Sequence, residues 1–148
     1  MYSNGKLLIS GEYVILDGAL SLAAPTLFGQ YLEIIEDDSK YIKWTSKNSN
    51  GKVWFQCKIF SENLELIKSS SSKISNTLIE IIKNIRVFNP NFLTNSGANI
   101  TTKLTFDKDW GLGSSSTLIS NLSKLAKIDP FKLNNKIFNG SGYDIACA

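Results

Sequence analysis

Polar and apolar residues alternate in several short segments of the chain, and this alternation predicts strands with one buried face. The longest segment runs from residue 98 to residue 106, with Ile100 on the apolar side and Asn99 on the polar side. The dipeptide Asn50-Gly51 favours a tight turn and stands between two further segments, which predicts a hairpin. The predicted strands cover residues 6–10, 13–16, 30–36, 41–46, 53–60 and 98–106.

Two other segments repeat apolar residues at the spacing of a helix with one buried face. The first covers residues 74–87 and follows a polar loop of serines at residues 69–72, and the second covers residues 114–128. In the second helix the polar residues lie opposite the apolar ones, so we expect them to face solvent. The apolar positions are Ile74, Leu78, Ile81, Ile82 and Ile85, then Leu118, Ile119, Leu122, Leu125 and Ala126; the polar positions are Ser120, Asn121, Ser123, Lys124 and Lys127.

Composition excludes several kinds of site. With 148 residues the chain favours one domain, and it has no histidine, which rules out a Ser-His-Asp triad and every histidine-ligated metal site. A general base must then be a carboxylate or a lysine. Cys57 and Cys147 match no metal-binding spacing and are typical of reduced thiols. The first residues form neither a signal peptide nor a spanning helix, so we expect a soluble cytoplasmic protein.

The net charge of +3 suits nucleic acid only if folding gathers the lysines on one surface. Along the predicted hairpin they are dispersed, which is typical of a solvated face. A nucleic-acid-binding module would need a surface patch that the sequence does not display. The dispersed lysines are Lys40, Lys43, Lys47, Lys52 and Lys58.

The segment Gly111–Ser116, with the sequence GLGSSS, stands directly before the second predicted helix. Glycines let a backbone approach a bulky anion, and the free N–H groups at a helix N-terminus bind phosphate. A helix that its own serines cap explains the same residues equally well. Local sequence alone leaves both interpretations open.

Three common strand-loop-helix motifs do not fit this segment. A Walker A loop needs a lysine after its last glycine, and Ser114 follows Gly113 instead. A dinucleotide-binding loop needs a third glycine where Ser116 stands. The nucleophile elbow of the α/β-hydrolases needs Gly-x-Ser-x-Gly and a histidine, which the chain lacks.

Three motifs in order resemble those of the GHMP small-molecule kinases, the family of galactokinase, homoserine kinase, mevalonate kinase and phosphomevalonate kinase. GLGSSS resembles the phosphate loop GLGSSA, KLLISGEYVILDG at residues 6–18 resembles the N-terminal lysine-bearing motif, and GSGYDIA at residues 140–146 resembles the segment with the catalytic aspartate. The GEY and GSGYD forms lie closest to the mevalonate and phosphomevalonate kinases, and GYDIA is typical of a bacterial subgroup.

This resemblance implies an α+β fold of the GHMP N-terminal type, a mixed sheet backed by helices in a two-layer core like that of some ribosomal proteins. It implies transfer of a phosphoryl group from ATP, with Mg²⁺, to a small alcohol or a phosphate monoester, most closely a mevalonate-like acid. A sugar or homoserine-type kinase, or a non-catalytic nucleotide- or RNA-binding module, is the alternative. The resemblance implies no membrane or nucleic-acid partner and is compatible with a homodimer.

The resemblance also assigns roles to residues. Asp144 would take the proton of the substrate hydroxyl, and Lys6 would lie beside it. Ser115 would bind Mg²⁺. The phosphates of ATP would be bound by Gly111, Leu112, Gly113, Ser114, Ser115 and Ser116, and the substrate by Glu12, Tyr13, Ser141 and Gly142.

Simpler interpretations exist for these residues. Lys6 could extend its apolar stem along a strand end, and Asp144 could bond its own backbone in a glycine-rich turn. The sequence also departs from the mevalonate-kinase pattern, because residues 129–139 lack the upstream glutamate that would bind Mg²⁺. Residues 1–148 would form an N-terminal ATP-binding domain that stops before the family's C-terminal domain.

Overall fold

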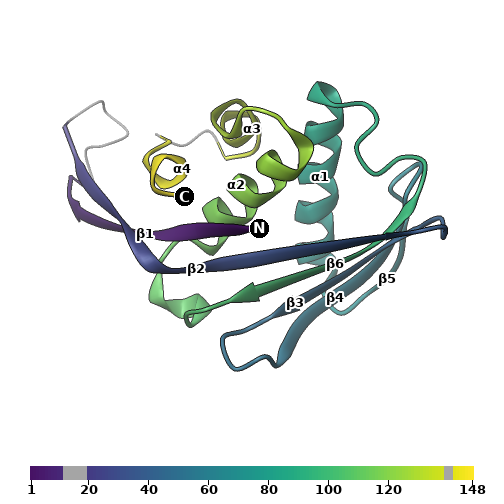
Figure 1. Ribbon diagram of the computed structural model, residues 1–148, viewed down its shortest axis with the longest axis horizontal. Coiled ribbons are helices and arrows are strands. Elements are labelled where there is room, and N and C mark those ends of the chain that lie inside the picture. The colour runs from purple at the N-terminus through teal and green to yellow at the C-terminus, as the bar shows by residue number, and fades with distance from the viewer. Residues whose placement is uncertain (12–19, 139–141) are drawn as a thin grey trace.

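The computed structural model describes residues 1–11, 20–138 and 142–148. They form two layers, a six-stranded sheet with the order β1-β2-β6-β3-β4-β5 and a set of helices that covers one of its faces (Figure 1). The strands are β1 (Tyr2–Ser10), β2 (Leu22–Asp37), β3 (Tyr41–Lys47), β4 (Val53–Phe60), β5 (Leu66–Ser69) and β6 (Gly97–Leu104); the helices are α1 (Ser72–Phe88), the 3-10 turn η2 (Lys108–Trp110), α2 (Ser114–Ala126), α3 (Pro130–Ile137) and α4 (Tyr143–Cys147).

The sheet is mixed, as the resemblance implied. β3 pairs with β6 in parallel, from Ile42↔Ala98 to Lys47↔Lys103, while the other neighbouring strands are antiparallel. The predicted hairpin is confirmed, with Asn48, Asn50 and Gly51 in the turn between β3 and β4. The α+β fold class is therefore confirmed.

The core lies between the helices and the covered face of the sheet. Alternate residues of the strands contribute Ile42, Phe55 and Ile100, which are at most 1% exposed. The helices contribute Ile82 and Leu122, both fully buried. Burying a side chain of this size stabilises the fold by about 1.5–3 kcal/mol, so these layers fix the position of α2.

The helix α2 differs from its prediction in one respect, because its polar residues are buried as well as its apolar ones. Ser120, Asn121 and Ser123 are at most 3% exposed, although the pattern placed them in solvent. Asn121 donates to the carbonyl of Gln30 at 2.9 Å, and Ser3 donates to Ser120 at 2.9 Å. Ser120 and Asn121 thus bind the first two strands through hydrogen bonds, whereas the Ser123 hydroxyl has no hydrogen-bond partner among the described residues.

Other differences concern element limits. β2 begins at Leu22, well before the predicted start, and the expected serine loop instead ends β5 and begins α1. α3 and α4 were not predicted as helices. The strand expected at residues 13–16 lies outside the described residues. Among the residues that the structure describes, no helix is long and apolar enough to cross a membrane.

Candidate functional site

The glycine-serine segment forms a loop that leads into α2. Gly111 and Gly113 have φ angles of 70° and 79°, which L side chains adopt only with strain. The first helical hydrogen bond runs from the amide of Thr117 to the carbonyl of Gly113, at 3.0 Å. The amides of Ser114 and Ser115 therefore precede the helical ladder, at the positive end of the helix dipole.

The serines do not cap this helix in the expected way. The N-cap residue is Gly113, and no side chain accepts a capping hydrogen bond there. Ser116 and Thr117 turn their hydroxyls back onto the carbonyls of Gly113 and Ser114, at 2.8 and 2.9 Å. Ser115 is exposed at the mouth of the loop. Its hydroxyl is available to a ligand.

Strand β1 holds the loop in place. The amide of Lys6 donates to the carbonyl of Leu112 at 3.0 Å. Gly5 makes this close approach possible, because a Cβ there would lie 2.8 Å from that carbonyl oxygen. A Cβ on Gly113 would lie 2.6 Å from the hydroxyl of Ser116 and 3.1 Å from Cγ of Lys6. The loop and the strand can pack this tightly only because both positions are glycine.

Lys6 and Asp144 lie side by side in front of the loop. Nζ of Lys6 is 3.2 Å from Oδ1 of Asp144 and donates to the hydroxyl of Tyr143 at 2.8 Å. Burial, the largest single effect, lowers the pKa of Lys6, but the hydrogen bond to Tyr143 and the charge of Asp144 outweigh it and raise the pKa above its ordinary value. Lys6 is therefore a cation at neutral pH.

Helix α4 positions Asp144. Gly142 is its N-cap with a φ of 83°, and it is buried against the ring of Phe131, where a Cβ would lie 3.3 Å away. Asp144 is in the first turn of α4, and its carboxylate faces Lys6 instead of its own backbone. Oδ1 is buried, and the ammonium of Lys6 lies 3.2 Å from it. A carboxylate oxygen has more than one lone pair, so it can accept a further hydrogen bond or a proton.

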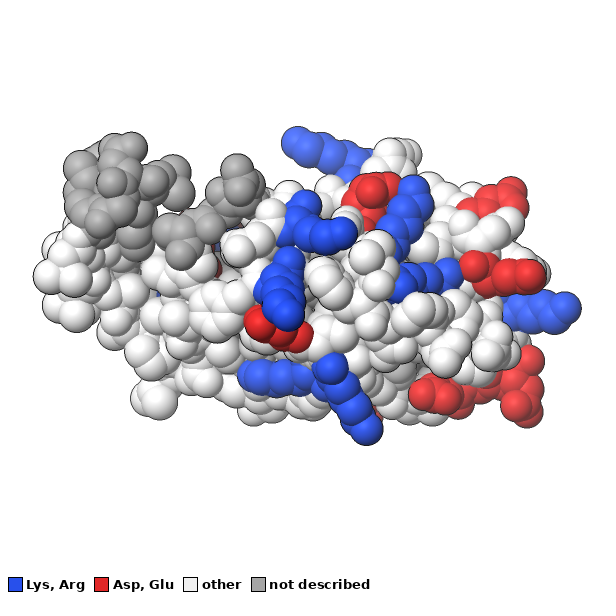
Figure 2. All heavy atoms as spheres, turned by 90° about the horizontal axis from the view of Figure 1, so that it is seen from above, with Lys and Arg blue, Asp and Glu red and all other residues white. Residues whose placement is uncertain are grey.

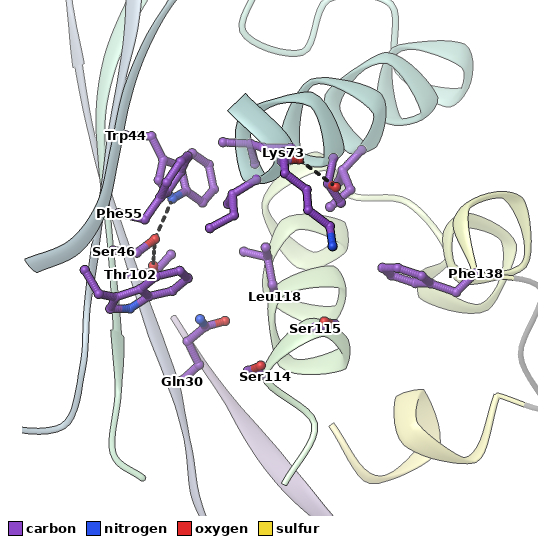
Figure 3. Close-up of a pocket in the computed structure, with 15 residues that line it drawn as sticks. Gln30, Trp44, Ser46, Phe55, Lys73, Thr102, Ser114, Ser115, Leu118 and Phe138 are labelled. Carbon is purple, nitrogen blue, oxygen red and sulfur yellow. Dashed lines mark hydrogen bonds between the residues drawn. The ribbon is translucent and has the colours of Figure 1, made fainter. Parts of the chain in front are cut away.

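Two hollows meet at the start of α2. The first is polar and is lined by Lys6, Lys108 and Asp144 together with the loop. The second is apolar and lies between the sheet, α1 and α2, with the rings of Trp44 and Phe55 on one wall (Figure 3). The residues that line both hollows are Ser114, Ser115 and Phe138.

The apolar hollow has a polar floor and a cation at its mouth. Trp44 and Thr102 both donate to the hydroxyl of Ser46, at 3.0 and 2.9 Å. Gln30 lies on the same side, next to Ser114 (Figure 3). Lys73 reaches from α1 across the mouth of the hollow toward α2 (Figure 3).

Most of the expected site residues in the described part of the chain come together. Lys6, Asp144 and the glycine-serine loop line one hollow, while Leu112 contributes its carbonyl to β1 and Gly142 begins α4. The expected substrate residues Glu12, Tyr13 and Ser141 lie outside the described residues. Four residues that line or border the hollows were not predicted from the sequence: Lys73, Lys108, Trp44 and Tyr143.

Lys73 and Lys108 carried no sequence signal, because isolated lysines next to a helix or loop are usually solvated. Among the described residues there is no group of three acidic or thiol side chains that could hold a metal ion by itself. Mg²⁺ usually binds through one or two protein oxygens, water and substrate phosphates. Ser115 and Asp144 supply oxygens of this kind at one hollow.

Comparisons with known proteins concern the fold of the chain. No protein-family model matches the chain, and no curated protein matches it in sequence. Among solved structures, 99% of the chain matches Methanococcus jannaschii mevalonate kinase, with a TM-score of 0.68 and 14% identity. The same share matches Streptococcus pneumoniae phosphomevalonate kinase in complex with phosphomevalonate and AMPPNP (0.69, 21%) and Lactococcus lactis galactokinase complexed with galactose (0.69, 18%).

The chain has the fold of a GHMP-kinase N-terminal domain. It spans 50%, 46% and 40% of the lengths of these three proteins. At this level of identity the likeness concerns the fold. In this chain the Lys6–Asp144 pair and the glycine-serine loop line one hollow where α2 begins.

Proposed function

We propose that the chain binds ATP as part of a small-molecule kinase that transfers the terminal phosphoryl group to an alcohol or a phosphate monoester. One observation carries this proposal: the apolar hollow and the polar hollow, which two lysines line, meet at the N-terminus of α2. A nucleotide matches these two hollows, because its base is flat and apolar while its phosphates are charged. In the proposed pose the base lies near Trp44 and Phe55 and the phosphates lie at Ser114 and Ser115.

The charges around the loop favour an anion. Lys73 borders the apolar hollow and Lys108 borders the polar one, and neither forms an ion pair with the described residues. The amides at the start of α2 add donors that need no side chain. Phosphoryl transfer depends mainly on such positioning and charge stabilisation.

The site also fits Mg²⁺. Ser115, which is exposed, and Asp144 line the same hollow, so a hydroxyl and a carboxylate would be available there to hold the ion. In the proposed site Ser115 binds the ion with the phosphates of ATP. When bound, Mg²⁺ neutralises charge on the phosphates that are transferred and released.

Asp144 and Lys6 act on the acceptor in this proposal. The carboxylate of Asp144 accepts the proton of the attacking hydroxyl and orients it, as a positioned base does. The cation of Lys6, 3.2 Å away, stabilises the charge that develops on the oxygens. The acceptor that we favour is a mevalonate-like acid or its phosphate, with a sugar or homoserine-type alcohol as the alternative.

We further propose that residues 1–148 act as one half of the kinase. Apolar side chains of β2 and of the turn η2 before the loop are exposed, with Leu22 at 57%, Leu27 at 95% and Trp110 at 60%. Trp110 packs edge-on against Phe28, also at the surface. A second domain of the same enzyme would cover these side chains and complete the acceptor pocket. We therefore expect residues 1–148 alone to bind ATP but to show little turnover.

Calorimetric titration of residues 1–148 with ATP and with adenosine tests the proposed pose. We expect ATP to bind more tightly than adenosine, because only ATP reaches the cations and amides at α2. Lys73→Met should lower the affinity for ATP about tenfold and leave the affinity for adenosine unchanged, since the lost contact is a charged hydrogen bond. Lys83→Met, on the same helix in an exposed pair with Glu80, is the matched control. Equal affinities for ATP and adenosine would contradict the proposal.

A further inference from the structure

One face of the sheet has no helices against it. The helices α1 to α4 all lie on the other face (Figure 1). On the helical side, blue and red side chains are interspersed (Figure 2). The bare face is different, because its strands place lysines next to one another.

Register brings three lysines from three strands into one row. Lys43 on β3 pairs with Lys58 on β4, and Lys58 pairs with Lys68 on β5. All three line a shallow hollow on the bare face, together with the polar side chains of Gln56 and Asn99. Like charges directly opposite one another destabilise a sheet. A row of this kind is unfavourable unless something anionic lies on it.

A second pair of lysines lies farther along the same strands. Lys47 on β3 is in register with Lys103 on β6, and both line another hollow of this face with Thr101. Strands rise about 3.3 Å per residue, so Lys43 and Lys47 are about 13 Å apart along β3. The two groups are too far apart for one small anion and suit an extended one. We call Lys43, Lys47, Lys58, Lys68 and Lys103 the basic face.

Few opposing charges offset the basic face. Asp37 pairs with Lys43 at 3.2 Å, and Glu33 borders the second hollow. Within the described residues, Lys47, Lys58, Lys68 and Lys103 form no ion pair. Folding thus gathers three of the lysines that are dispersed along the hairpin, Lys43, Lys47 and Lys58, with Lys68 and Lys103.

Aromatic rings lie among these lysines. Tyr41 and Phe60, a cross-strand pair, meet edge to face with their ring centres 5.8 Å apart. Nζ of Lys58 lies 3.6 Å from the centre of the Tyr41 ring. Rings on an open sheet with neighbouring cations are the features that bind unpaired bases and their phosphates.

We propose that the basic face binds single-stranded nucleic acid. An acidic protein would use the cations but not the rings, and a membrane surface would require a projecting apolar segment among the lysines. An unpaired strand uses both features, with phosphates at the two lysine groups and bases against Tyr41 and Phe60. The proposal is independent of the kinase site, which lies on the helical side of the sheet.

Fluorescence anisotropy with a labelled uridine oligomer of about 20 nucleotides tests this proposal on the whole chain at about 50 mM salt. We expect micromolar binding that weakens with salt. Lys58→Ala with Lys68→Ala should weaken binding at least about fivefold and flatten the logarithmic salt slope by about 0.7 for each lysine removed. Lys132→Ala with Lys136→Ala, at exposed positions on α3, should leave both quantities unchanged.

Four outcomes would overturn the proposal. They are no binding, equal losses in both double variants, displacement of the oligomer by ATP, and equally tight binding of polyglutamate or of phosphatidylserine vesicles. Tyr41→Leu provides a second check, because it leaves all the charges in place. The substitution should weaken binding of the oligomer and leave the salt slope unchanged, since base stacking involves no counterion. Unaltered affinity in this variant would also contradict the proposal.

Discussion

The backbone amide of Lys6 donates to the backbone carbonyl of Leu112 at 3.0 Å, so the strand that carries the lysine also fixes the loop before α2. The bond needs no side chain from either residue. It fixes the main chain of Lys6 relative to the start of the helix, while Tyr143 and Asp144 hold its ammonium. A substitution that displaces the loop should therefore also displace Lys6, and a substitution that displaces this part of β1 should displace the loop.

Gly113→Ala should abolish ATP binding by residues 1–148. The φ of 79° strains an alanine by about 1–2 kcal/mol, and the new Cβ would lie 2.6 Å from the Ser116 hydroxyl. Gly51→Ala is the matched control, since it has a φ of 86° but open space around it in the β3–β4 turn. Urea unfolding should show a loss in both variants, and calorimetry a loss of ATP binding only in Gly113→Ala. Normal ATP affinity in Gly113→Ala would show that the loop does not contact the nucleotide.

Ser115→Ala should affect binding far more than stability. Its side chain is exposed and caps nothing, so the free energy of unfolding should change by less than about 0.5 kcal/mol. If the hydroxyl binds Mg²⁺, the gain in ATP affinity that Mg²⁺ produces should shrink in the variant. Titrations with and without Mg²⁺ measure this difference directly. An unchanged Mg²⁺ effect would remove Ser115 from the metal site.

Asp144→Asn should lower kcat by about 10²- to 10⁴-fold in a polypeptide that joins this chain to the second domain proposed above. The amide can still occupy the position, but it cannot accept the proton. ATP affinity should change little, because in the proposed pose ATP is held mainly by the loop and α2. Steady-state turnover and calorimetry separate the two effects, and Asp38→Asn at an exposed distant position is the control. A kcat within a few-fold of the wild type would exclude Asp144 as the base.

Asp37 should make the fold sensitive to acid. Hydrogen bonding by Ser39, together with Lys43 and Asn99, lowers the pKa of Asp37 from 3.8 to about 2. A lowered pKa stabilises the fold above about pH 4, and this contribution disappears as the pH falls toward 2. Urea unfolding between pH 5 and pH 2.5 should therefore show a smaller acid-dependent loss in Asp37→Asn than in the wild type. If the free energy of unfolding fell equally with pH in the two proteins, the lowered pKa of Asp37 would be contradicted.

The pattern of apolar residues predicted the elements that bury one continuous face. The two long helices and the β3–β4 hairpin are confirmed, because their spacing or turn residues act locally. The start of β2 was missed because Ala23, Ala24 and Pro25 have weak strand preferences, and pairing with β1 overrides them. Local propensity cannot report a strand that its neighbour stabilises.

Two other misses have different causes. α3 had a readable start, since Asp129 precedes Pro130 and accepts from the amides of Phe131 and Lys132. The buried serines of α2 had no such signal. Ser120 accepts from Ser3 and the neighbouring Asn121 donates to Gln30, both far away in the sequence, so only the folded arrangement shows why this face is polar.

The candidate site was predictable in composition but not in extent. Motif order pointed to Lys6, Asp144 and the loop, and the structure brings them to one hollow. Their roles remain predictions for the experiments above. Lys73 comes from a helix with no motif, so its place at the mouth of the apolar hollow depends on how α1 packs against the sheet.

The hydrogen bond from Lys6 to Tyr143 joins residues 137 positions apart. A ribosome adds about 5–20 residues per second, so Lys6 leaves the exit tunnel on the order of ten seconds before its partner. Throughout that interval the nascent sheet exposes an ammonium group that is later buried against α4. The candidate site therefore cannot assemble before residue 144 has been made, and a chain released before that point would carry the loop and the lysine without the carboxylate.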